Sequence, residues 1–483
     1  MTATQDASRT LSKDVASSIA QDPAPLAAGG PEPDYFDWAE AWHPVHYIED
    51  LDKHRPTRFT LLDRAIVIWW DPNAATWRVF ADQCPHRLAP LSEGRINEAG
   101  LLECPYHGWT FGGSGLCEHI PQQSSDGEAH LSNRACVASM PTAVRQGLLF
   151  VYPGKADNAA QVPVPIIDPV EDEPDGWVML NTFRDLPYDA LTLLENVLDA
   201  SHIPYTHHQT VGKRENAAPM QMDILKSGKQ GFQGIWPEGP RKGKLGTQHT
   251  TFVAPSLMYH DLTSKQFGRT LTVVYATPIR KGECRLFARF PFKFSSKLPG
   301  FFIKLTPRWY SHVSNNRVLE DDQIFLHLQE RLLEKAGVGT ASLADERSYA
   351  QACYLPTQAD RYVVAFRKWI SEFNADPFVG QALPPQQTTE ALLNRYDSHT
   401  KHCGSCRPAL KRIQQIRQGT LIASAIAWSL IPLVLTFFDD FPMPAGFLLT
   451  GIPLAAGALW LWLGNLEQKF YLGSEIPPRN FLK

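Results

Sequence analysis

The N-terminal part of the chain alternates short apolar runs with turn residues. β-branched and aromatic residues fill three such runs, at residues 59–62, 66–70 and 77–80. Runs of this length, bounded by Gly, Pro, Asn and Asp, predict β-strands joined as hairpins. A further hairpin is expected at 94–102. The pattern of this region therefore predicts a small all-β domain.

The middle of the chain combines strand-type and helix-type spacing. Between residues 220 and 294, apolar runs separated by Gly and Pro predict an antiparallel sheet that would line a substrate cavity. Apolar residues recur at helical spacing near 193–198, 319–330 and 360–373. A sheet accompanied by helices is therefore expected in this region.

The C-terminal part contains two uncharged apolar runs of eighteen residues each, at 421–438 and 446–463. This length is at the lower limit for an α-helix that crosses a bilayer. Basic residues outside the two runs would keep both flanks, and the catalytic body, on the cytoplasmic or stromal face. The runs predict a transmembrane hairpin, and a buried helical hairpin of a soluble protein is the alternative.

These patterns together predict an α+β chain with an all-β domain, a helix-grip-like antiparallel-sheet domain and a two-helix transmembrane hairpin. The first residues are rich in Ala, Ser, Pro and Asp without apolar periodicity, which predicts a disordered leader. This leader has neither the apolar core of a signal peptide nor the acid-poor composition of a transit peptide. The expected segments are the leader (1–33), the β domain (34–152), a linker (153–176), a catalytic domain (177–400), a cysteine-containing segment (401–420), the hairpin (421–464) and a tail (465–483).

Charge and cysteine usage exclude two classes of protein. The 483 residues carry a formal net charge of −4, so no basic field predicts binding to nucleic acid. Of eight cysteines, four belong to motifs and the other four are scattered, which is not the pattern of a disulfide framework. The soluble part is therefore expected in a reducing compartment.

Two short loops each combine one cysteine with one histidine, as Cys84-Pro-His86-Arg and Cys104-Pro-Tyr-His107. This ligand set fits a 2Fe–2S cluster of the Rieske type, with Cys84 and Cys104 on one iron and His86 and His107 on the other. A zinc site uses the same residue types. Zinc fingers, however, pair cysteine with cysteine and histidine with histidine, so the mixed pairs favour the iron–sulfur cluster. Gly108 would let the backbone approach the sulfides closely.

A second set of ligands is predicted downstream. Asn196, Asp199 and His202 are spaced by three residues and would share one face of a helix. Pro204 would then end or kink this helix and re-aim His207. Two histidines and a later carboxylate form the ligand triad of non-haem Fe(II) oxygenases, which leaves coordination positions open.

Two positions of this triad have alternatives. His202 and His207 are the predicted histidines, and His208 is the alternative to His207. The carboxylate is expected at the start of a helix over 319–330, where Asp322 is favoured over Asp321. Acids placed at a helix N-terminus by the helix dipole alone are the competing interpretation.

The two sets of motifs together resemble the Rieske non-haem iron oxygenases. The runs from Cys84 to Gly94 and from Asn196 to His207 look closest to the pheophorbide a oxygenase branch. That branch also contains chlorophyllide a oxygenase and two translocon-associated Rieske proteins of the chloroplast envelope. The resemblance covers most of the chain, from about residue 38 past residue 406. It implies a Rieske cluster, a mononuclear non-haem Fe(II) and oxygen insertion into a chlorophyll-related tetrapyrrole.

The resemblance also implies how these parts act together. Such enzymes form head-to-tail homotrimers in which the cluster of one subunit reaches the iron of the next. Asp199 would then bridge a cluster histidine and an iron histidine, and Asn196 would assist near the iron. Ferredoxin would supply single electrons, and O₂ would bind only when substrate and an electron are both in place.

A further motif is Cys403-Gly-Ser-Cys406, which His399 and His402 precede. A CxxC pair is half of a zinc site, but no second CxxC completes it. A redox dithiol is the alternative. The pheophorbide a oxygenase-like and translocon-associated proteins carry a similar CxxC with a suspected link to thioredoxin, so a redox dithiol and spectator thiols both stay open.

Three functions remain as hypotheses: an oxygenase of pheophorbide a, chlorophyllide a or protochlorophyllide a, a membrane redox component without turnover, and a translocon-associated interaction protein. The triad argues against a pure electron carrier, which needs no open iron site. A membrane hairpin suits a hydrophobic tetrapyrrole. A cyanobacterial thylakoid or plasma membrane is the expected location, and a plastid envelope or thylakoid is the alternative.

Overall fold

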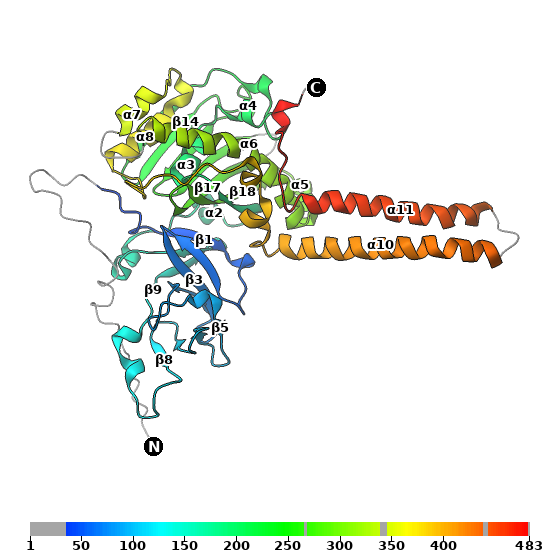
Figure 1. Cartoon of the computed structure of the whole chain (residues 1–483). Coiled ribbons are helices and arrows are strands. Elements are labelled where there is room, and N and C mark those ends of the chain that lie inside the picture. Colours follow the sequence, from blue (N-terminus) through cyan, green and yellow to red (C-terminus); the bar gives the residue numbers. More distant parts are fainter. Residues whose placement is uncertain (1–34, 265–267, 339–344, 438–442, 482–483) are drawn as a thin grey trace, which may run out of the picture.

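The structure is a computed structural model of the 483-residue chain, and it describes residues 35–264, 268–338, 345–437 and 443–481. Figure 1 shows two lobes built mainly of strands and helices, with a pair of long helices projecting to one side. The chain runs through the smaller lobe first, then through the larger lobe and finally through the helix pair. The predicted leader, residues 1–33, lies outside the described residues.

The smaller lobe consists of three small antiparallel sheets. Their strand orders are β1-β11-β10, β2-β3-β4-β9 and β5-β6-β7-β8. The strands are β1 (His43–Tyr47), β2 (Thr57–Leu61), β3 (Arg64–Asp71), β4 (Thr76–Ala81), β5 (Arg95–Ile96), β6 (Leu102–Glu103), β7 (Thr110–Phe111), β8 (Cys117–His119), β9 (Ser139–Met140), β10 (Thr142–Arg145) and β11 (Leu148–Val151).

The hairpins of this lobe are where the spacing of apolar residues predicted them. Strand β3 has Ile66, Val67, Ile68 and Trp69 fully buried, so both faces of the strand are covered. Val67 and Trp69 pack with Phe80 and the cysteines of the predicted cluster, while Ile66 and Ile68 pack in a separate cluster of apolar side chains. Strands β5 and β6 form the second predicted hairpin. The prediction of an all-β unit is confirmed.

The larger lobe is organised around one seven-stranded antiparallel sheet in the order β12-β18-β17-β16-β15-β14-β13. The predicted sheet of residues 220–294 is therefore confirmed, with β12 added at one edge from an earlier part of the chain. The strands are β12 (Val178–Leu186), β13 (Asp223–Gly228), β14 (Gly231–Trp236), β15 (Gln248–Val253), β16 (Leu257–Ser264), β17 (Gly268–Arg280) and β18 (Glu283–Phe294).

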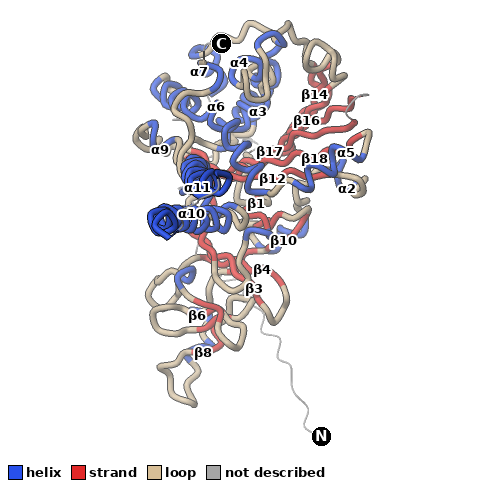
Figure 2. Tube along the Cα trace, turned by 90° about the vertical axis from the view of Figure 1, so that its right-hand side faces the viewer, coloured by secondary structure: helices blue, strands red, loops and turns tan. Residues whose placement is uncertain are grey.

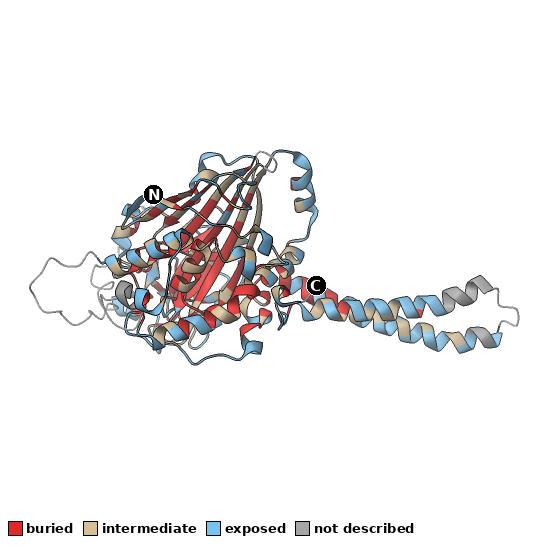
Figure 3. Cartoon of the chain, turned by 90° about the horizontal axis from the view of Figure 1, so that it is seen from above, coloured by how far each residue is buried: buried red, intermediate tan, exposed pale blue. Residues whose placement is uncertain are grey.

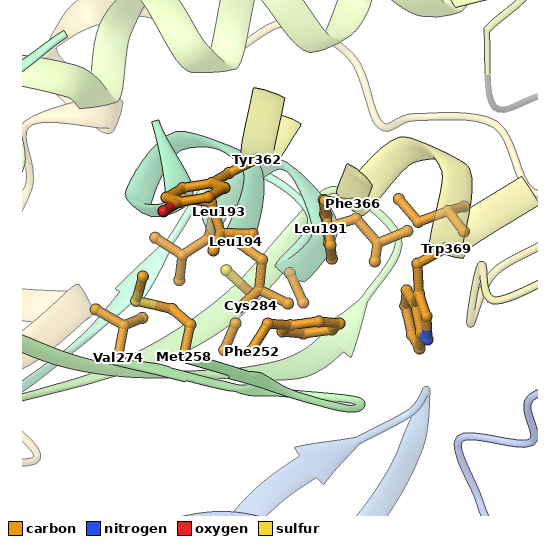
Figure 4. Close-up of a cluster of buried hydrophobic side chains, with 14 of the residues drawn as sticks. Leu191, Leu193, Leu194, Phe252, Met258, Val274, Cys284, Tyr362, Phe366 and Trp369 are labelled. Atoms are coloured by element: carbon orange, nitrogen blue, oxygen red, sulfur yellow. The ribbon is translucent and has the colours of Figure 1, made fainter. Parts of the chain in front are cut away.

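Helices cover one face of this sheet (Figure 2). In Figure 4 the leucines of α3, Leu191, Leu193 and Leu194, lie over Phe252 and Val274 of the sheet. Each fully buried leucine contributes about 1.5–3 kcal/mol relative to an exposed one, so these contacts hold α3 firmly in place. The helices of the chain are α2 (Asp168–Asp172), α3 (Ala190–Leu198), α4 (Ile203–Thr206), α5 (Lys297–Leu305), α6 (Arg308–Lys335), α7 (Asp345–Ala352), α8 (Arg361–Glu372), α9 (Thr389–Leu392), α10 (Cys406–Phe437) and α11 (Met443–Gln468).

The other face of the sheet packs on the smaller lobe. Tyr47 of β1 lies in one cluster with Phe183 and Phe287, and its hydroxyl donates to the carbonyl of Ala288 at 3.3 Å. The strands β17 and β18 are thus largely buried on both sides, whereas most of the edge strand β13 is exposed. Figure 3 shows the buried strands in red. This packing covers one face of the sheet, and the leucines of α3 cover part of the other face. A cavity of about 270 Å³ is lined by residues 178–181 of β12, at the edge of the sheet.

Helices α10 and α11 form the projecting antiparallel pair. Helix α10 begins at Cys406, fifteen residues before the predicted apolar run. Within the described part of the chain, one helical stretch, Cys406–Leu433, is long and apolar enough to cross a membrane. A helical hairpin is therefore present, but its transmembrane character is supported for one helix only.

Candidate metal centres

The two Cys-His loops of the smaller lobe have the same backbone hydrogen bonds. The amide of Cys84 donates to the carbonyl of Ala89, and the amide of Leu88 returns to the carbonyl of Cys84, both at 2.8 Å. In the second loop, Cys104 donates to Trp109 at 2.8 Å, and Gly108 donates to Cys104 at 3.1 Å. The residue that closes each loop has a positive φ, 61° at Leu88 and 72° at Gly108. Gly108 adopts this conformation without strain, which is a local reason for glycine there.

The side chains of these loops separate into a buried and an accessible pair. Cys84 and Cys104 are 1% and 3% exposed, whereas His86 is exposed and His107 half-buried. The centroids of the two imidazole rings are 4.5 Å apart, and the Trp109 ring stacks on the His86 ring with a centroid separation of 4.7 Å. Burial raises the pKa of Cys84 to about 12, so its thiolate needs a cation beside it. The two loops fit a cluster whose cysteine ligands are buried and whose histidine ligands face the surface.

A second group of ligand atoms lies in the larger lobe. The Nε2 atoms of His202 and His207 are 3.3 Å apart, and an oxygen of Asp322 lies 3.3 Å from His207 Nε2 and another lies 3.9 Å from His202 Nε2. One ligand atom from each residue fits within 4.8 Å of the others. Two imidazoles and one carboxylate at this spacing can hold a single divalent ion and leave its remaining positions open.

The local fold around this group differs from the prediction at one point. Helix α3 ends at Leu198, and Asp199 is extended with φ −80° and ψ 95°, so Asp199 and His202 do not share a helix face. The Asp199 side chain accepts from the amide of Ser201 at 2.7 Å, a local hydrogen bond that competes with helix continuation. The prediction of one continuous helix from Asn196 to His202 was wrong. His202 is instead the N-cap of the separate short helix α4, and Pro204 lies in the first turn of that helix, where proline is tolerated.

The carboxylates occupy a different part of their helix than expected. Helix α6 begins at Arg308, so Asp321 and Asp322 lie in its middle and not at its N-terminus. The interpretation that the helix dipole alone placed them there was therefore wrong. Both side chains are buried, and a buried carboxylate needs a cation or several donors.

Asp321 and Asp322 contact different atoms of the same histidine. Asp322 faces His207 Nε2 at 3.3 Å, whereas Asp321 accepts from His207 Nδ1 at 3.3 Å and from the hydroxyl of Thr210 at 2.7 Å. His202 donates from Nδ1 to the carbonyl of Asp199, which leaves its Nε2 for the shared centre. Such outer hydrogen bonds fix the ring orientation of metal-binding histidines. The sequence predicts Asp321 only as an alternative to Asp322, and no spacing rule signals its orienting contact.

The electrostatics of the triad fit a bound cation. Burial raises the pKa of Asp322 to about 6, and burial lowers the pKa of His202 to about 4. In the part of the chain that the structure describes, Asp322 Oδ1 is a buried oxygen without a hydrogen-bond partner. A neutral imidazole and an unpartnered carboxylate oxygen directed at one point are what a divalent ion requires.

The other predicted residues of this region lie close by. The Asn196 side chain hydrogen-bonds Asp322 and favours its ionised form. The carbonyl of Asp199 accepts from His202 Nδ1, and its carboxylate accepts from the amide of Ser201. His208, the alternative ligand, instead accepts from the amide of Arg214 at 3.3 Å. His208 also lines a cavity of about 570 Å³. The lining of this cavity includes four cationic side chains, Lys213, Arg214, Arg241 and Lys244, and one acidic side chain, Glu215.

A third group joins the CxxC motif to two histidines. Cys403, Cys406, His312 and His399 are all buried, and one ligand atom from each lies within 4.8 Å of the others. His402, which the sequence offered together with His399, does not belong to this group. His312 comes from α6, ninety-one residues before Cys403, so the sequence contained no local signal for it.

Comparison with known proteins agrees with this geometry. Residues 41–142 match the family described as Rieske 2Fe–2S domain, and residues 252–339 match the family described as pheophorbide a oxygenase. The chain is 36% identical to pheophorbide a oxygenase of Arabidopsis thaliana, over 91% of this chain and 85% of that one. It is 38% identical to the Oryza sativa subsp. japonica protein of the same name (80% and 77%) and 34% identical to flavonoid 8-hydroxylase 2 of Ocimum basilicum (81% and 78%).

Solved structures share the fold at lower sequence similarity. NdmB of Pseudomonas putida CBB5 superposes with a TM-score of 0.54 at 21% identity, covering 72% of this chain and 97% of that one. Dicamba monooxygenase bound to dicamba superposes with a TM-score of 0.52 at 22% identity, covering 68% and 97%. At these identities the likenesses show the fold alone.

Proposed function

The chain belongs to the Rieske oxygenases of the pheophorbide a oxygenase family, and on this basis we propose that it inserts oxygen into a chlorophyll-related tetrapyrrole. The observation that carries the proposal is the open group of His202, His207 and Asp322. An electron carrier has no need of a second, incompletely filled centre. The four residues Cys84, His86, Cys104 and His107 are proposed as the ligands of the Rieske cluster, and the triad as the ligands of iron.

The two cofactors supply the oxidative chemistry, since the cluster exchanges single electrons and the mononuclear Fe(II) activates O₂. The chain's own residues hold the ligands in the correct protonation state. Asp321 accepts the Nδ1 proton of His207, and the carbonyl of Asp199 accepts the Nδ1 proton of His202, so both Nε2 lone pairs are directed to the centre. Asn196 hydrogen-bonds Asp322 and partly opposes the rise that burial causes in the pKa of that carboxyl. Burial of His207 and Asp322 limits the access of water.

The cavity lined by residues 208–216, Arg241 and Lys244 suits an anionic substrate. Its volume of about 570 Å³ lies in the range of ligand pockets. Its cationic lining suits the free carboxylate that a de-esterified chlorophyll derivative carries. The relatives named pheophorbide a oxygenase and flavonoid 8-hydroxylase 2 are consistent with a ring substrate, and the first of them favours the tetrapyrrole.

We further propose that the α10–α11 pair anchors the enzyme to a membrane. Many apolar side chains along both helices are exposed, among them Ile422, Trp428, Ile452 and Trp462. Exposed apolar area of this extent is costly in water and is removed by lipid. A ferredoxin donor, a head-to-tail homotrimer with Asp199 between subunits, and a thioredoxin partner are proposed on family membership alone. The same holds for a photosynthetic membrane, cyanobacterial or plastid, as the location.

Turnover by the purified, detergent-solubilised protein tests the proposal. The protein would receive reduced ferredoxin, O₂ and, separately, pheophorbide a, chlorophyllide a, protochlorophyllide a or a flavone. We expect an oxygenated product from one tetrapyrrole, detected by mass spectrometry. A product from the flavone alone would replace the substrate class. Cluster reoxidation without product from any compound would favour the redox-component hypothesis.

A pair of charge-reversal variants tests whether the cationic cavity binds the carboxylate. Arg241→Glu should raise the KM for a carboxylate-bearing tetrapyrrole more than it lowers kcat, because Arg241 lines the cavity and not the triad. Lys229→Glu makes the same change of charge outside the residues that line this cavity and serves as the control. Equal KM values for both variants would exclude the cavity as the binding site of the carboxylate.

A further inference from the structure

The buried group formed by His312, His399, Cys403 and Cys406 has the composition of a closed metal site. The sulfur of Cys403 lies 3.4 Å from His312 Nδ1, and the sulfur of Cys406 lies 3.5 Å from His312 Nδ1 and 3.3 Å from His399 Nε2. The two ring nitrogens are 3.1 Å apart. For a tetrahedral zinc ion with bonds of about 2.3 Å to sulfur and about 2.05 Å to nitrogen, the expected sulfur–nitrogen separation is about 3.5 Å and the nitrogen–nitrogen separation about 3.3 Å.

The other ring nitrogen of each histidine is already committed. His312 Nε2 donates to the carbonyl of Asn181 at 2.8 Å, and His399 Nδ1 donates to the carbonyl of Phe183 at 2.6 Å. Both carbonyls belong to β12, two residues apart, so one strand orients both rings. Each neutral ring carries a single proton, which these bonds use. His312 Nδ1 and His399 Nε2 therefore face each other with their lone pairs, an arrangement that a cation between them stabilises.

The backbone around the group supports the same conclusion. Residues Tyr396–Thr400, which carry His399, form a π-helical turn, a rare conformation that occurs often at functional sites. The amide of Cys406 donates to the sulfur of Cys403 at 3.4 Å, a contact that favours a thiolate there. All four side chains are at most 1% exposed, so water does not solvate two thiolates in this place.

We propose that these four residues bind one zinc-type divalent cation, as a site separate from the Rieske cluster and the iron triad. Two thiolates and two imidazoles without an open position are the ligand set of structural zinc. The ion would join α6, the π-helical turn and the first turn of α10 beneath β12. It would also fix the smaller lobe, because the amide of Gly404 donates to Asp50 at 2.7 Å. The proposal does not depend on the substrate or on oxygenase turnover.

Metal analysis of the full-length protein, purified in detergent without chelator, tests this site directly. We expect about one zinc per chain in addition to about three irons. Cys403→Ser and Cys406→Ser should each reduce zinc to a small fraction while the Rieske EPR signal stays. Cys353→Ser, at a cysteine outside the group, should retain zinc in full.

A measurement on the unmutated chain keeps the test valid if a variant does not fold. Protein produced in zinc-depleted medium and loaded with Co²⁺ should show the absorption of a tetrahedral thiolate–cobalt site, and equimolar Zn²⁺ should abolish it. Protein with three irons, no zinc and no cobalt uptake would overturn the proposal. A disulfide between Cys403 and Cys406 in the freshly purified chain would overturn it too, and would favour the redox dithiol.

Discussion

Two groups of metal-type ligands use the same helix and differ in what they leave open. Asp322 of α6 joins His202 and His207 in a group of three, whereas His312 of the same helix joins two cysteines and His399 in a group of four. In both groups, a hydrogen bond to the second ring nitrogen of each histidine directs the first nitrogen to the centre. The number and type of the remaining ligands decide whether a centre can take a substrate molecule or only hold the fold.

The surroundings of the two groups also differ in how open they are. The three-ligand group contains a carboxylate oxygen without a partner within the described chain, and the residues that follow His207 in sequence, 208–216, line a cavity. The four-ligand group lies between β12 and the base of the hairpin, and its side chains have almost no exposed surface. One helix therefore connects a centre suited to reaction with a centre suited to support, ten residues apart.

The largest expected effect comes from removing the carboxylate of the open group. Asp322→Ala should abolish measurable turnover, because two imidazoles alone hold a divalent ion poorly. Iron should fall from about three to about two per chain, and the Rieske EPR signal should persist. Turnover assays and metal analysis check this result, and full activity of the variant would refute the assignment of Asp322.

A smaller effect should follow from changing the carboxylate that only orients a ligand. Asp321→Asn should lower kcat by about 10–100-fold, the range found when an outer partner of a metal ligand is changed. Glu330→Gln, at a buried acid of the same helix two turns beyond, is the matched control and should lower kcat much less. Iron content separates the two ideas, since Asp321→Asn should retain more iron than Asp322→Ala.

The four-ligand group should affect stability more than catalysis. His399→Ala removes one proposed ligand and the bond to Phe183, and it should lower the thermal unfolding midpoint of the larger lobe by several degrees, corresponding to about 2–4 kcal/mol. Turnover per retained iron should stay within about threefold of the original. Calorimetry and iron-normalised rates measure both quantities, and a stable variant with lost turnover would assign the group to catalysis.

The smallest effect distinguishes a histidine that only packs from one that binds metal. His260 accepts from Thr250 and donates to the carbonyl of Val197, and burial lowers its pKa to about 4. The unfolded chain, with a pKa near 6.5, binds more protons between about pH 6.5 and 4, so stability falls as the pH falls through this window by up to about 3 kcal/mol. His260→Gln should therefore show a smaller decrease in unfolding midpoint between pH 7 and 4.5, at unchanged metal content. An identical pH dependence in both proteins would contradict this prediction.

Local patterns were sufficient where one loop or one strand carries the information. The hairpins before Cys84, the antiparallel strands of residues 220–294 and the helix of Tyr362 and Phe366 all appear as predicted. The Cys-His loops could be recognised because their ligands lie within three residues of one another. The family match over residues 41–142 agrees with that reading.

Tertiary structure decided what depends on contacts between distant segments. Asp321 and Asp322 are adjacent in the sequence, and their different roles depend on His207, which lies more than one hundred residues earlier. Asp322 faces His207 Nε2 at the centre, whereas Asp321 accepts a hydrogen bond from His207 Nδ1. It contained the CxxC, but the ligand from α6 that accompanies it has no local signal. The predicted continuous helix to His202 was wrong for a local reason instead, because the carboxylate of Asp199 accepts a hydrogen bond from the amide of Ser201.

The sequence by itself thus determined the ligand types, the strand periodicity and the apolar C-terminal runs, because these follow from side-chain chemistry and nearest-neighbour spacing. The folded chain alone decided which side chains share a centre, and how many positions each centre leaves open. The physical reason is that a metal site depends on distances of a few ångströms between atoms on separate elements. These distances are set by how the sheet, α3 and α6 pack together.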